Sequence, residues 1–362
     1  MKHIQKIFVT VGSLCVLCGT TQAQSAKPTV ESTPKYNPTF DGIGPKVYFL
    51  PPPRTENEVL IDDYAEKRVF HDSIARAMQF QDLLTEFRFT SKRHLVQQYY
   101  QQLPATSEEW NKAINQETSL GNTAFAAALM NEYAWLSLNK HFLPQTVGLL
   151  IGAVDLESGN VLEDDFTALQ RNLADVYLYN RNYREAAALQ ERLLAKLDRH
   201  SSIVEQAHAY TRMALVQAYL KDYKLAENSI IRKAIPLYNR AKDRQSKVLA
   251  WQLLASIYQM HDKHTEAQWF LIQARDLAAA SNFRRELGTI EYMLASSKLE
   301  QKNYKVALLE FARAEELAVE EKDPLLQLAI HDKKGEAHLA LSQFKEAKEE
   351  LTQYWKLREQ LF

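Results

Sequence analysis

Small residues recur at a nearly constant interval along the last two-thirds of the chain. The first series is spaced by 40, 40, 41, 40 and 40 residues and runs through Ala134, Ala174, Ala214, Ala255, Ala295 and Gly335. A second series follows twelve residues after each member: Thr146, Ala186, Ala226, Ala267, Ala307 and Ala347. Three residues before the second series lies a mostly aromatic one: Leu143, Tyr183, Tyr223, His264, Tyr304 and Phe344. Three series in register over six units predict six copies of one supersecondary unit.

Each unit has the pattern of two antiparallel helices. Apolar residues spaced by three and four flank a short polar turn, such as residues 179–182 in the second unit. One small residue lies on each helix, where a side chain larger than a methyl group would push the pair apart. Because one pair cannot bury its apolar faces alone, the units must stack, and we predict an all-α solenoid over residues 122–362. Thr146 and Gly335 depart from alanine in the first and last units, as expected at the ends of a stack.

The fourth unit resembles the tetratricopeptide (TPR) repeat. The residues that carry the pattern are Trp251, Leu254, Ala255, Tyr258, Ala267, Leu271 and Ala274. The period is 40 rather than 34 residues and the closing proline is usually missing, as in the kinesin-light-chain variety and in bacterial signalling proteins. The resemblance implies a right-handed superhelix of about six helix pairs. Residues 347–362 also look like the helix that closes the periplasmic TPR domain of sensor histidine kinases.

The resemblance also implies a concave groove that binds peptides or protein segments. Carried over position by position, the groove residues are Asn131, Trp135, Asn139, Arg171, Asp175, Tyr179, His208, Tyr219, Gln252, Gln259 and Tyr292. The competing interpretation is that several of them only pack against the neighbouring unit. The pair of basic residues with which some family members hold a terminal carboxylate is not visible, since Arg171 stands alone.

The residues before the array show no clean repeat. Residues 61–121 have helical spacing, and we expect an N-terminal helical cap there. Residues 24–60 are expected to form an extended linker, because seven of the eleven prolines lie between Gln24 and Pro53. A proline-rich ligand for another domain is the alternative.

The first 23 residues have the pattern of a secretory signal peptide. Lys2 and Lys6 precede a short apolar run, and Thr21 and Ala23 are small residues at the positions that a signal peptidase reads. The chain is therefore expected to be exported, most simply to the periplasm of a Gram-negative bacterium, with no membrane span after cleavage. An uncleaved anchor and lipidation at Cys18 remain alternatives. Both cysteines lie in this segment, so cleavage at Ala23 would leave no thiol.

Composition narrows the function without naming it. Ten glycines in 362 residues make about 3%, against a usual share of roughly 7%, which favours helices over sheets and phosphate-binding loops. The balance of 44 basic and 45 acidic residues argues against a nucleic-acid binder. His261 and His264 could hold one edge of a metal site, but His264 belongs to the aromatic series and packing is the simpler role. We therefore expect no enzyme, no cofactor and no metal.

Three functions follow from these features. The first is a non-enzymatic exported adaptor that binds another cell-envelope protein or peptide in the groove. The second is a ligand-sensing subunit that signals to a separate membrane kinase or regulator. The third is a structural component of a secretion or polysaccharide-assembly complex. The partner and the oligomeric state are left open.

Overall fold

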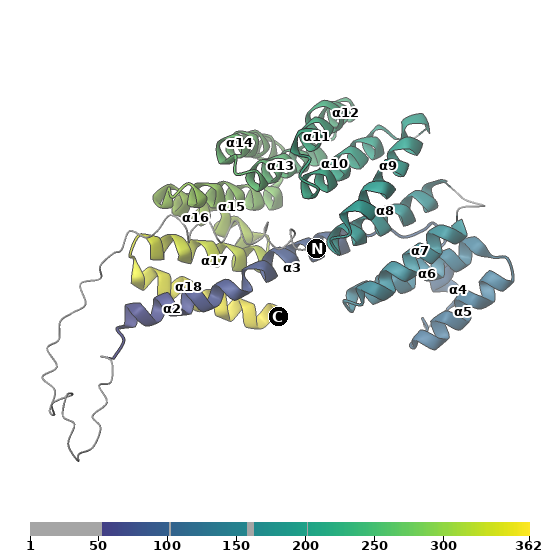
Figure 1. The fold of residues 1–362 in the computed structure, drawn as a ribbon, viewed down its shortest axis with the longest axis horizontal. Helices are drawn as coiled ribbons and strands as arrows, with labels where there is room; N and C mark the ends of the chain where they lie inside the picture. Colours follow the sequence, from purple (N-terminus) through teal and green to yellow (C-terminus); the bar gives the residue numbers. More distant parts are fainter. Residues whose placement is uncertain (1–52, 101–102, 158–162, 201) are drawn as a thin grey trace, which may run out of the picture. The chain divides into compact units, whose positions relative to one another are not determined.

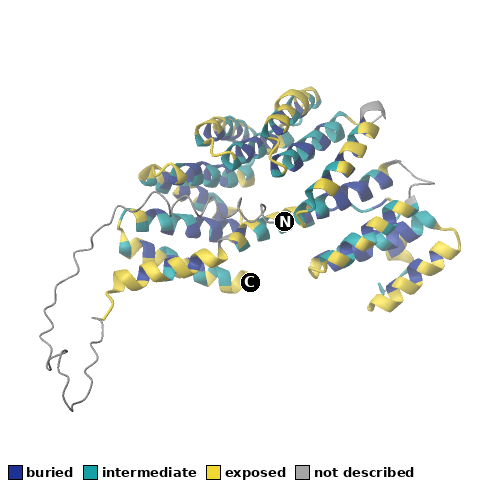
Figure 2. Cartoon of the chain, viewed as in Figure 1, coloured by how far each residue is buried: buried dark blue, intermediate teal, exposed yellow. Residues whose placement is uncertain are grey.

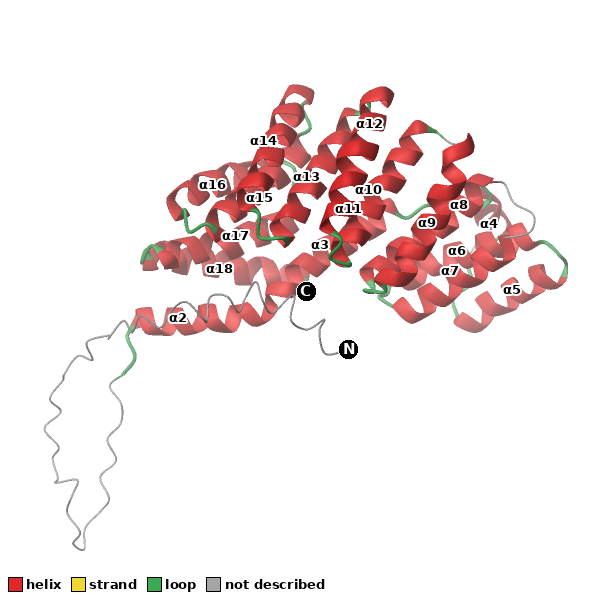
Figure 3. Ribbon diagram, turned by 45° about the horizontal axis from the view of Figure 1, so that its top comes forward, coloured by secondary structure: helices red, strands yellow, loops and turns green. Residues whose placement is uncertain are grey.

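A computed structural model describes residues 53–100, 103–157, 163–200 and 202–362. Glu56–Phe362 form one compact unit, separate from Met1–Thr55. The expected signal peptide and nearly all of the expected linker lie outside the described residues. Within the described residues every regular element is a helix and no strand occurs (Figure 1; Figure 3). None of the described helices is long and apolar enough to cross a bilayer.

Six helix pairs follow one another from residue 123 to the C-terminus, which confirms the predicted all-α, TPR-like solenoid. Each pair has a first helix A and a second helix B. The pairs are α6 (Thr123–Asn139) with α7 (Leu143–Glu157), α8 (Glu163–Tyr179) with α9 (Tyr183–His200), α10 (Ile203–Tyr219) with α11 (Tyr223–Asn228), η2 (Ser229–Ala234) and α12 (Ile235–Ala241), α13 (Arg244–Met260) with α14 (His264–Ser281), α15 (Arg284–Glu300) with α16 (Tyr304–Glu320), and α17 (Pro324–Ala340) with α18 (Phe344–Leu361). Each helix contacts the next along the chain.

The two small-residue series lie at the contacts between helices. All alanines of both series and Thr146 are at most 4% exposed, and Gly335 is buried as well. Figure 2 shows the buried residues concentrated where helices face one another. The third series marks the first residue of helix B in every unit. The register read from the sequence is therefore confirmed.

The turns explain why the chain needs so little glycine. The middle residue of each three-residue A–B connection has a positive φ, the left-handed conformation in which glycine is usual. None of these residues is glycine: they are His141, Arg181, Lys221, Asp262, Lys302 and Ser342, with φ between 57° and 71°. The backbone N–H groups around them close the A helix, as Asn303 N does on Lys298 O at 2.9 Å.

The one interval of 41 residues has a structural cause in the B helix of the third unit. There η2 is a π-helical turn between α11 and α12. A π turn takes up an extra residue because its hydrogen bonds join i to i+5 rather than i+4. Buried positions confirm its location: Ala226, Ile230, Ala234 and Tyr238 correspond to Ala267, Leu271, Ala274 and Ala278 of the next unit, with the extra residue between Ile230 and Ala234.

The residues expected to form an N-terminal cap are distributed over the whole array. Together with residues 56–60, which were expected to belong to the extended linker and are helical, they form α2 (Glu56–Lys67), η1 (Arg68–Phe70), α3 (His71–Glu86), α4 (Arg93–Tyr99) and α5 (Ser107–Ser119). α4 and α5 pack on the first unit through α6, and Leu83 of α3 shares a core cluster with Ala134 and Leu138 of that unit. α2 contacts α18 of the last unit, and α3 contacts both α17 and α8 (Figure 1). Helical periodicity predicts that these segments are helices, but it does not predict which helices of the array they cover.

Candidate functional site

α3 lies along the A helices, on the face that the TPR resemblance assigns to ligands. We call this face the groove. Near its middle, the Arg76 guanidinium stands 4.8 Å from the Tyr179 ring centre, and the Phe80 ring lies 5.5 Å from the same ring. Gln79 donates a hydrogen bond of 3.2 Å to the Tyr219 hydroxyl. Two predicted groove residues, Tyr179 and Tyr219, therefore contact the protein's own helix.

After α3 the chain becomes extended and continues in the groove. Phe87 has φ −60° and ψ 130°. The Asn172 side chain accepts from the Arg88 backbone N–H at 2.9 Å and donates to the Arg88 carbonyl at 2.6 Å. The Asn131 amide donates to the same carbonyl at 3.1 Å and accepts from Asn172 at 3.1 Å. Two buried asparagines thus bind the main chain of an extended residue, as a receptor binds a peptide.

The side chains of this segment alternate between two environments. Phe87 and Phe89 both pack on Trp135, with ring centres 5.2 and 5.5 Å away. Arg88 forms an ion pair of 3.1 Å with Glu205 on α10. Alternation of this kind follows from an extended backbone, in which neighbouring side chains point in opposite directions.

The segment ends in a second polar anchor. The Asp165 carboxylate accepts from the Ser91 N–H at 2.6 Å and from the Ser91 hydroxyl at 2.7 Å. Arg93 then pairs with Glu132 at 3.0 Å and covers the Phe89 ring. We call residues 86–91 the internal segment.

Charged side chains connect the internal segment to two A helices, α8 and α10. Glu205 holds both Arg88 and Arg171, each at 3.1 Å. Arg212 bonds Asp175 at 2.7 Å and also pairs with Glu86. The sequence did not reveal this cluster, because Arg88 lies outside the repeats and comes to Arg171 only through the docking of the segment.

The cluster shifts the pKa values of its members. Burial, together with the positive charges of Arg212 and Arg88, lowers the pKa of Arg171 to about 10. Burial opposes ionisation of Glu205, but Arg171 and Arg88 outweigh it and lower the pKa of that carboxyl. Arg171 is 7% exposed, and its Nε lacks a hydrogen-bond partner. A small cavity of about 330 Å³ borders the three arginines and His208. Burial and the positive charges of Arg171 and Arg212 lower the pKa of His208.

The remaining predicted groove residues lie away from the internal segment. Gln252 donates to the Glu286 carbonyl at 3.1 Å, and Gln259 donates to the Met293 carbonyl at 3.2 Å, so both join helix A of one unit to helix A of the next. Asn139 is exposed and bonds Trp135 O within its own helix. Tyr292 is half-buried, 6.1 Å from the Phe311 ring. Contact of these residues with a partner stays a prediction.

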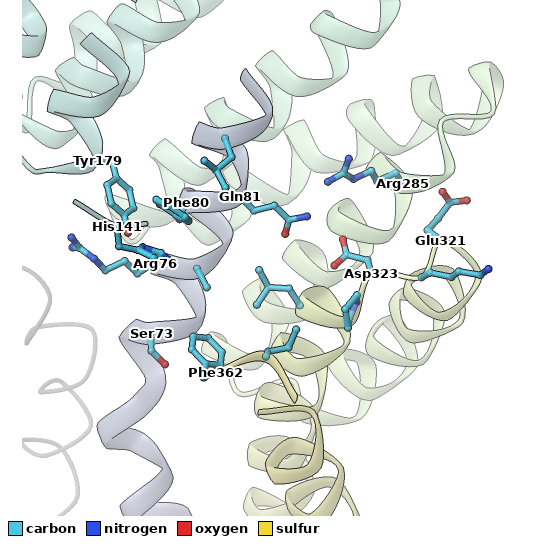
Figure 4. A pocket seen from close by; sticks show the side chains of 16 residues that line it. Ser73, Arg76, Phe80, Gln81, His141, Tyr179, Arg285, Glu321, Asp323 and Phe362 are labelled. Atoms are coloured by element: carbon cyan, nitrogen blue, oxygen red, sulfur yellow. The ribbon is translucent and has the colours of Figure 1, made fainter. Parts of the chain in front are cut away.

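A larger cavity of about 890 Å³ remains open beside α3 (Figure 4). One wall is α3, with Arg76, Phe80 and Gln81. The opposite wall is built by the start of α15, the α16–α17 turn and the end of α18, and includes Arg285, Asp323 and Phe362. The walls combine apolar rings with charges of both signs, a composition that suits a polypeptide segment.

Asp82 lies on α3 near this cavity and has an unusual carboxyl. Part of the Asp82 side chain is accessible to solvent. Protein atoms of the groove nevertheless replace much of the water around its carboxyl group. The resulting loss of hydration, together with Glu86 and Asp323, raises its pKa to about 6, although Arg285 acts in the opposite direction.

The histidine pair considered in the sequence occupies a turn and a helix start. His264 lies 3.4 Å from the Ser297 hydroxyl of the next unit. Among the described residues, no group of three or more histidine, cysteine or acidic side chains is arranged to hold a metal ion.

Comparison with known proteins identifies the fold. No protein-family model and no curated protein matches the sequence. A Rap protein complexed with competence and sporulation factor has a TM-score of 0.52 and 13% identity, over 83% of this chain and 77% of its own. Aspartyl phosphate phosphatase F from Bacillus subtilis has a TM-score of 0.51 and 14% identity, over 86% and 77%. The Rap conjugation gene regulator of plasmid pLS20, in complex with the Phr* peptide, has a TM-score of 0.50 and 14% identity, over 70% and 73%.

At these identities the likeness shows the architecture alone. This chain is similar to TPR-like repeat proteins in its all-α solenoid.

Proposed function

We propose that this protein is an exported, non-enzymatic adaptor that binds a segment of another cell-envelope protein in its groove. The observation that carries the proposal is the set of hydrogen bonds between the side chains of Asn172 and Asn131 and the backbone of Arg88. Bonds to main-chain N–H and C=O groups suit any extended polypeptide, and aromatic and charged side chains beside them add selectivity. The groove thus holds polypeptide by contacts of the kind that a partner would use.

The open cavity offers room for such a partner. Its volume of about 890 Å³ lies within the range of ligand pockets, and its walls come from both ends of the array. Two structures that share the fold are complexes, one with competence and sporulation factor and one with the Phr* peptide. Binding of a peptide or protein segment by this chain is consistent with them.

We base the proposal of export on the sequence of residues 1–23. We base the proposal of a non-enzymatic role on the ion pairs that the charged groups of the groove form. The clustered arginines and carboxylates around Glu205 and Arg212 pair with one another and with the internal segment, as those of a binding surface do. Mass spectrometry of the mature N-terminus tests export. A chain beginning at Gln24 in the periplasmic fraction is expected, and a cytosolic chain that retains residue 1 would contradict it.

In-cell photocrosslinking tests the binding site. A photoreactive amino acid replaces Gln81 or Phe362, which line opposite walls of the cavity, or Trp269, which is 58% exposed on α14 and lines neither groove cavity. We expect the first two positions to capture the same envelope protein and the third to capture none of it. Equal capture at Trp269 would contradict the groove as the site.

A ligand-sensing subunit is the second candidate, and one feature favours it. α3 contacts α8 and α17, so a ligand in the cavity touches helices from both ends of the array. Such a ligand would change the contacts through which α3 connects the two ends of the array. A rise in melting temperature with a small molecule, without capture of a protein at Gln81, would favour this function over the adaptor.

A further inference from the structure

We propose that the groove recognises an extended segment with the order aromatic–basic–aromatic followed two residues later by serine, and that residues 86–91 occupy this site as an internal ligand. A partner segment of the same chemistry replaces them. The inference rests on the proposed function and goes further, because it names the sequence that the partner presents.

Two buried asparagines bind the main chain of the internal segment. Asn131 and Asn172 are each 1% exposed, and their amide groups are directed at one residue of the internal segment. Without an extended chain there, these buried amides would lose hydrogen bonds, which is costly. The site therefore requires an occupant with a free backbone N–H and C=O at the central position.

The second step is selectivity by side chains. Trp135 and the rings at positions 87 and 89 form a three-ring cluster, in which Phe87 and Phe89 are 5.4 Å apart. On the opposite side Glu205 lies between two arginines, and Arg88 supplies one of them. Asp165 receives two hydrogen bonds from Ser91. An occupant with this order of side chains satisfies every one of these groups.

The third step is exchange. A partner with the same side chains forms the same contacts, so its binding balances the loss of the internal ones. The internal segment has the advantage of its covalent connection, which acts as a local concentration on the order of millimolar. Weakening the internal segment should therefore raise the affinity for an external copy without any change in the receptor residues.

The experiment uses a fluorescein-labelled peptide with the sequence of residues 84–93, LTEFRFTSKR, titrated with the full chain. The variant Arg88→Ala/Phe89→Ala weakens the internal ligand. We expect it to bind the peptide at least tenfold more tightly than wild type, and Asn172→Ala added to that variant should remove the gain. A peptide with the same residues in scrambled order, and the distant variant Trp269→Ala, are the matched controls.

Equal affinities of variant and wild type would overturn the proposal, as would a gain that survives Asn172→Ala. Circular dichroism checks that each variant is folded, and Arg88→Ala/Ser91→Ala, which leaves the aromatic cluster intact, serves if the first variant is not. If a variant becomes dimeric on gel filtration and does not bind the peptide, the occupant of the groove is a second copy of this chain. That result would overturn the proposal of a separate partner.

The outcomes separate this inference from the adaptor function. Capture of a protein at Gln81 together with failure of the peptide would leave the adaptor function standing and remove the recognition sequence. Binding of the peptide without capture in cells would support the recognition sequence and remove the envelope partner.

Discussion

Tyr64 of α2 packs its ring on Gly335 of α17. Gly335 occupies the position that holds alanine in the five preceding units, and a Cβ there would overlap the Tyr64 hydroxyl and lie 3.0 Å from its Cζ. The hydroxyl donates a hydrogen bond of 2.7 Å to the carbonyl of Ala347, the second small residue of the same unit. α2 is therefore inserted at the contact between the two helices of the last pair.

Gly335→Ala should destabilise the protein although alanine favours helix. Overpacking of a buried contact costs typically about 1–3 kcal/mol, while the gain in helix propensity is about 1 kcal/mol. Urea unfolding measures the change. In a Tyr64→Ala background the clash is gone, and the same substitution should become stabilising by about 1 kcal/mol. Gly148 is the matched control, since a Cβ there meets nothing within 4 Å.

Loss of stability by Gly148→Ala, or an unchanged sign in the Tyr64→Ala background, would contradict this explanation of Gly335.

The array could be predicted from the sequence, whereas the docking of its N-terminal segment could not. The repeat is periodic, and each small residue has counterparts 40 positions away that reveal its role. Gly335 was visible as a departure but was interpreted as the end of a stack, because its cause, Tyr64, leaves no periodic trace. Tyr64 and the carbonyl that it bonds are 283 positions apart.

The candidate site divides in the same way. Asn131, Trp135, Arg171 and Asp175 were predicted as groove residues from their place in the repeat, and they surround the internal segment. Asn172 was missed because the carried-over pattern placed the groove position at Arg171. Arg88 was missed because only the tertiary fold brings it to the groove.

Lys67 anchors α2 through a buried ion pair. Its ammonium is 2.8 Å from the Asp332 carboxylate, with side-chain exposures of 1% and 4%. Lys67→Ala leaves that buried carboxylate without the ammonium, a change that typically costs about 3–5 kcal/mol when the structure cannot open. We expect α2 to undock, so hydrogen exchange should accelerate in residues 56–67 and stay slow in α14.

The control is an exposed pair that joins α2 to α18, Lys348 with Glu56 at 3.7 Å. Lys348→Ala should change stability by at most about 1 kcal/mol. Similar exchange rates in both variants would show that the buried pair does not hold α2.

Asp82 should make stability depend on pH. Its pKa of about 6 in the folded protein exceeds that of an unfolded aspartate, about 4, so the folded state binds the proton more tightly. Stability from this group is complete below about pH 4 and is lost as pH rises through 6. Asp82→Asn should therefore match wild type at pH 4 and be more stable at pH 7, as measured by urea unfolding. A difference that is constant over this range would contradict the raised pKa.

Ala255 tests the contact between helices inside the array. It is fully buried on α13, and an aspartate there would place an unpaired charge between helices. We expect Ala255→Asp to cost more than about 3 kcal/mol in urea unfolding. Ala279→Asp on the exposed face of α14 should stay within about 0.5 kcal/mol. Equal stabilities of the two variants would mean that the small-residue series does not mark the helix contacts.

The π turn in the third unit offers a test in which removal of a residue leaves the fold intact. Ile231 lies in η2 between the buried Ile230 and Ala234, so its deletion restores the spacing of Ala267, Leu271 and Ala274 in the next unit. Ile272 occupies the corresponding place in the regular helix α14, and the two side chains are 36% and 38% exposed. Deletion of Ile272 turns every later residue of α14 by about 100° and takes Ala274 and Ala278 out of the core. We expect the chain without Ile231 to unfold at nearly the wild-type urea concentration and the chain without Ile272 to lose several kcal/mol. Comparable losses of stability in the two deletion variants would contradict this explanation. They would show that the extra residue contributes to stability in a way that the spacing of the apolar residues does not explain.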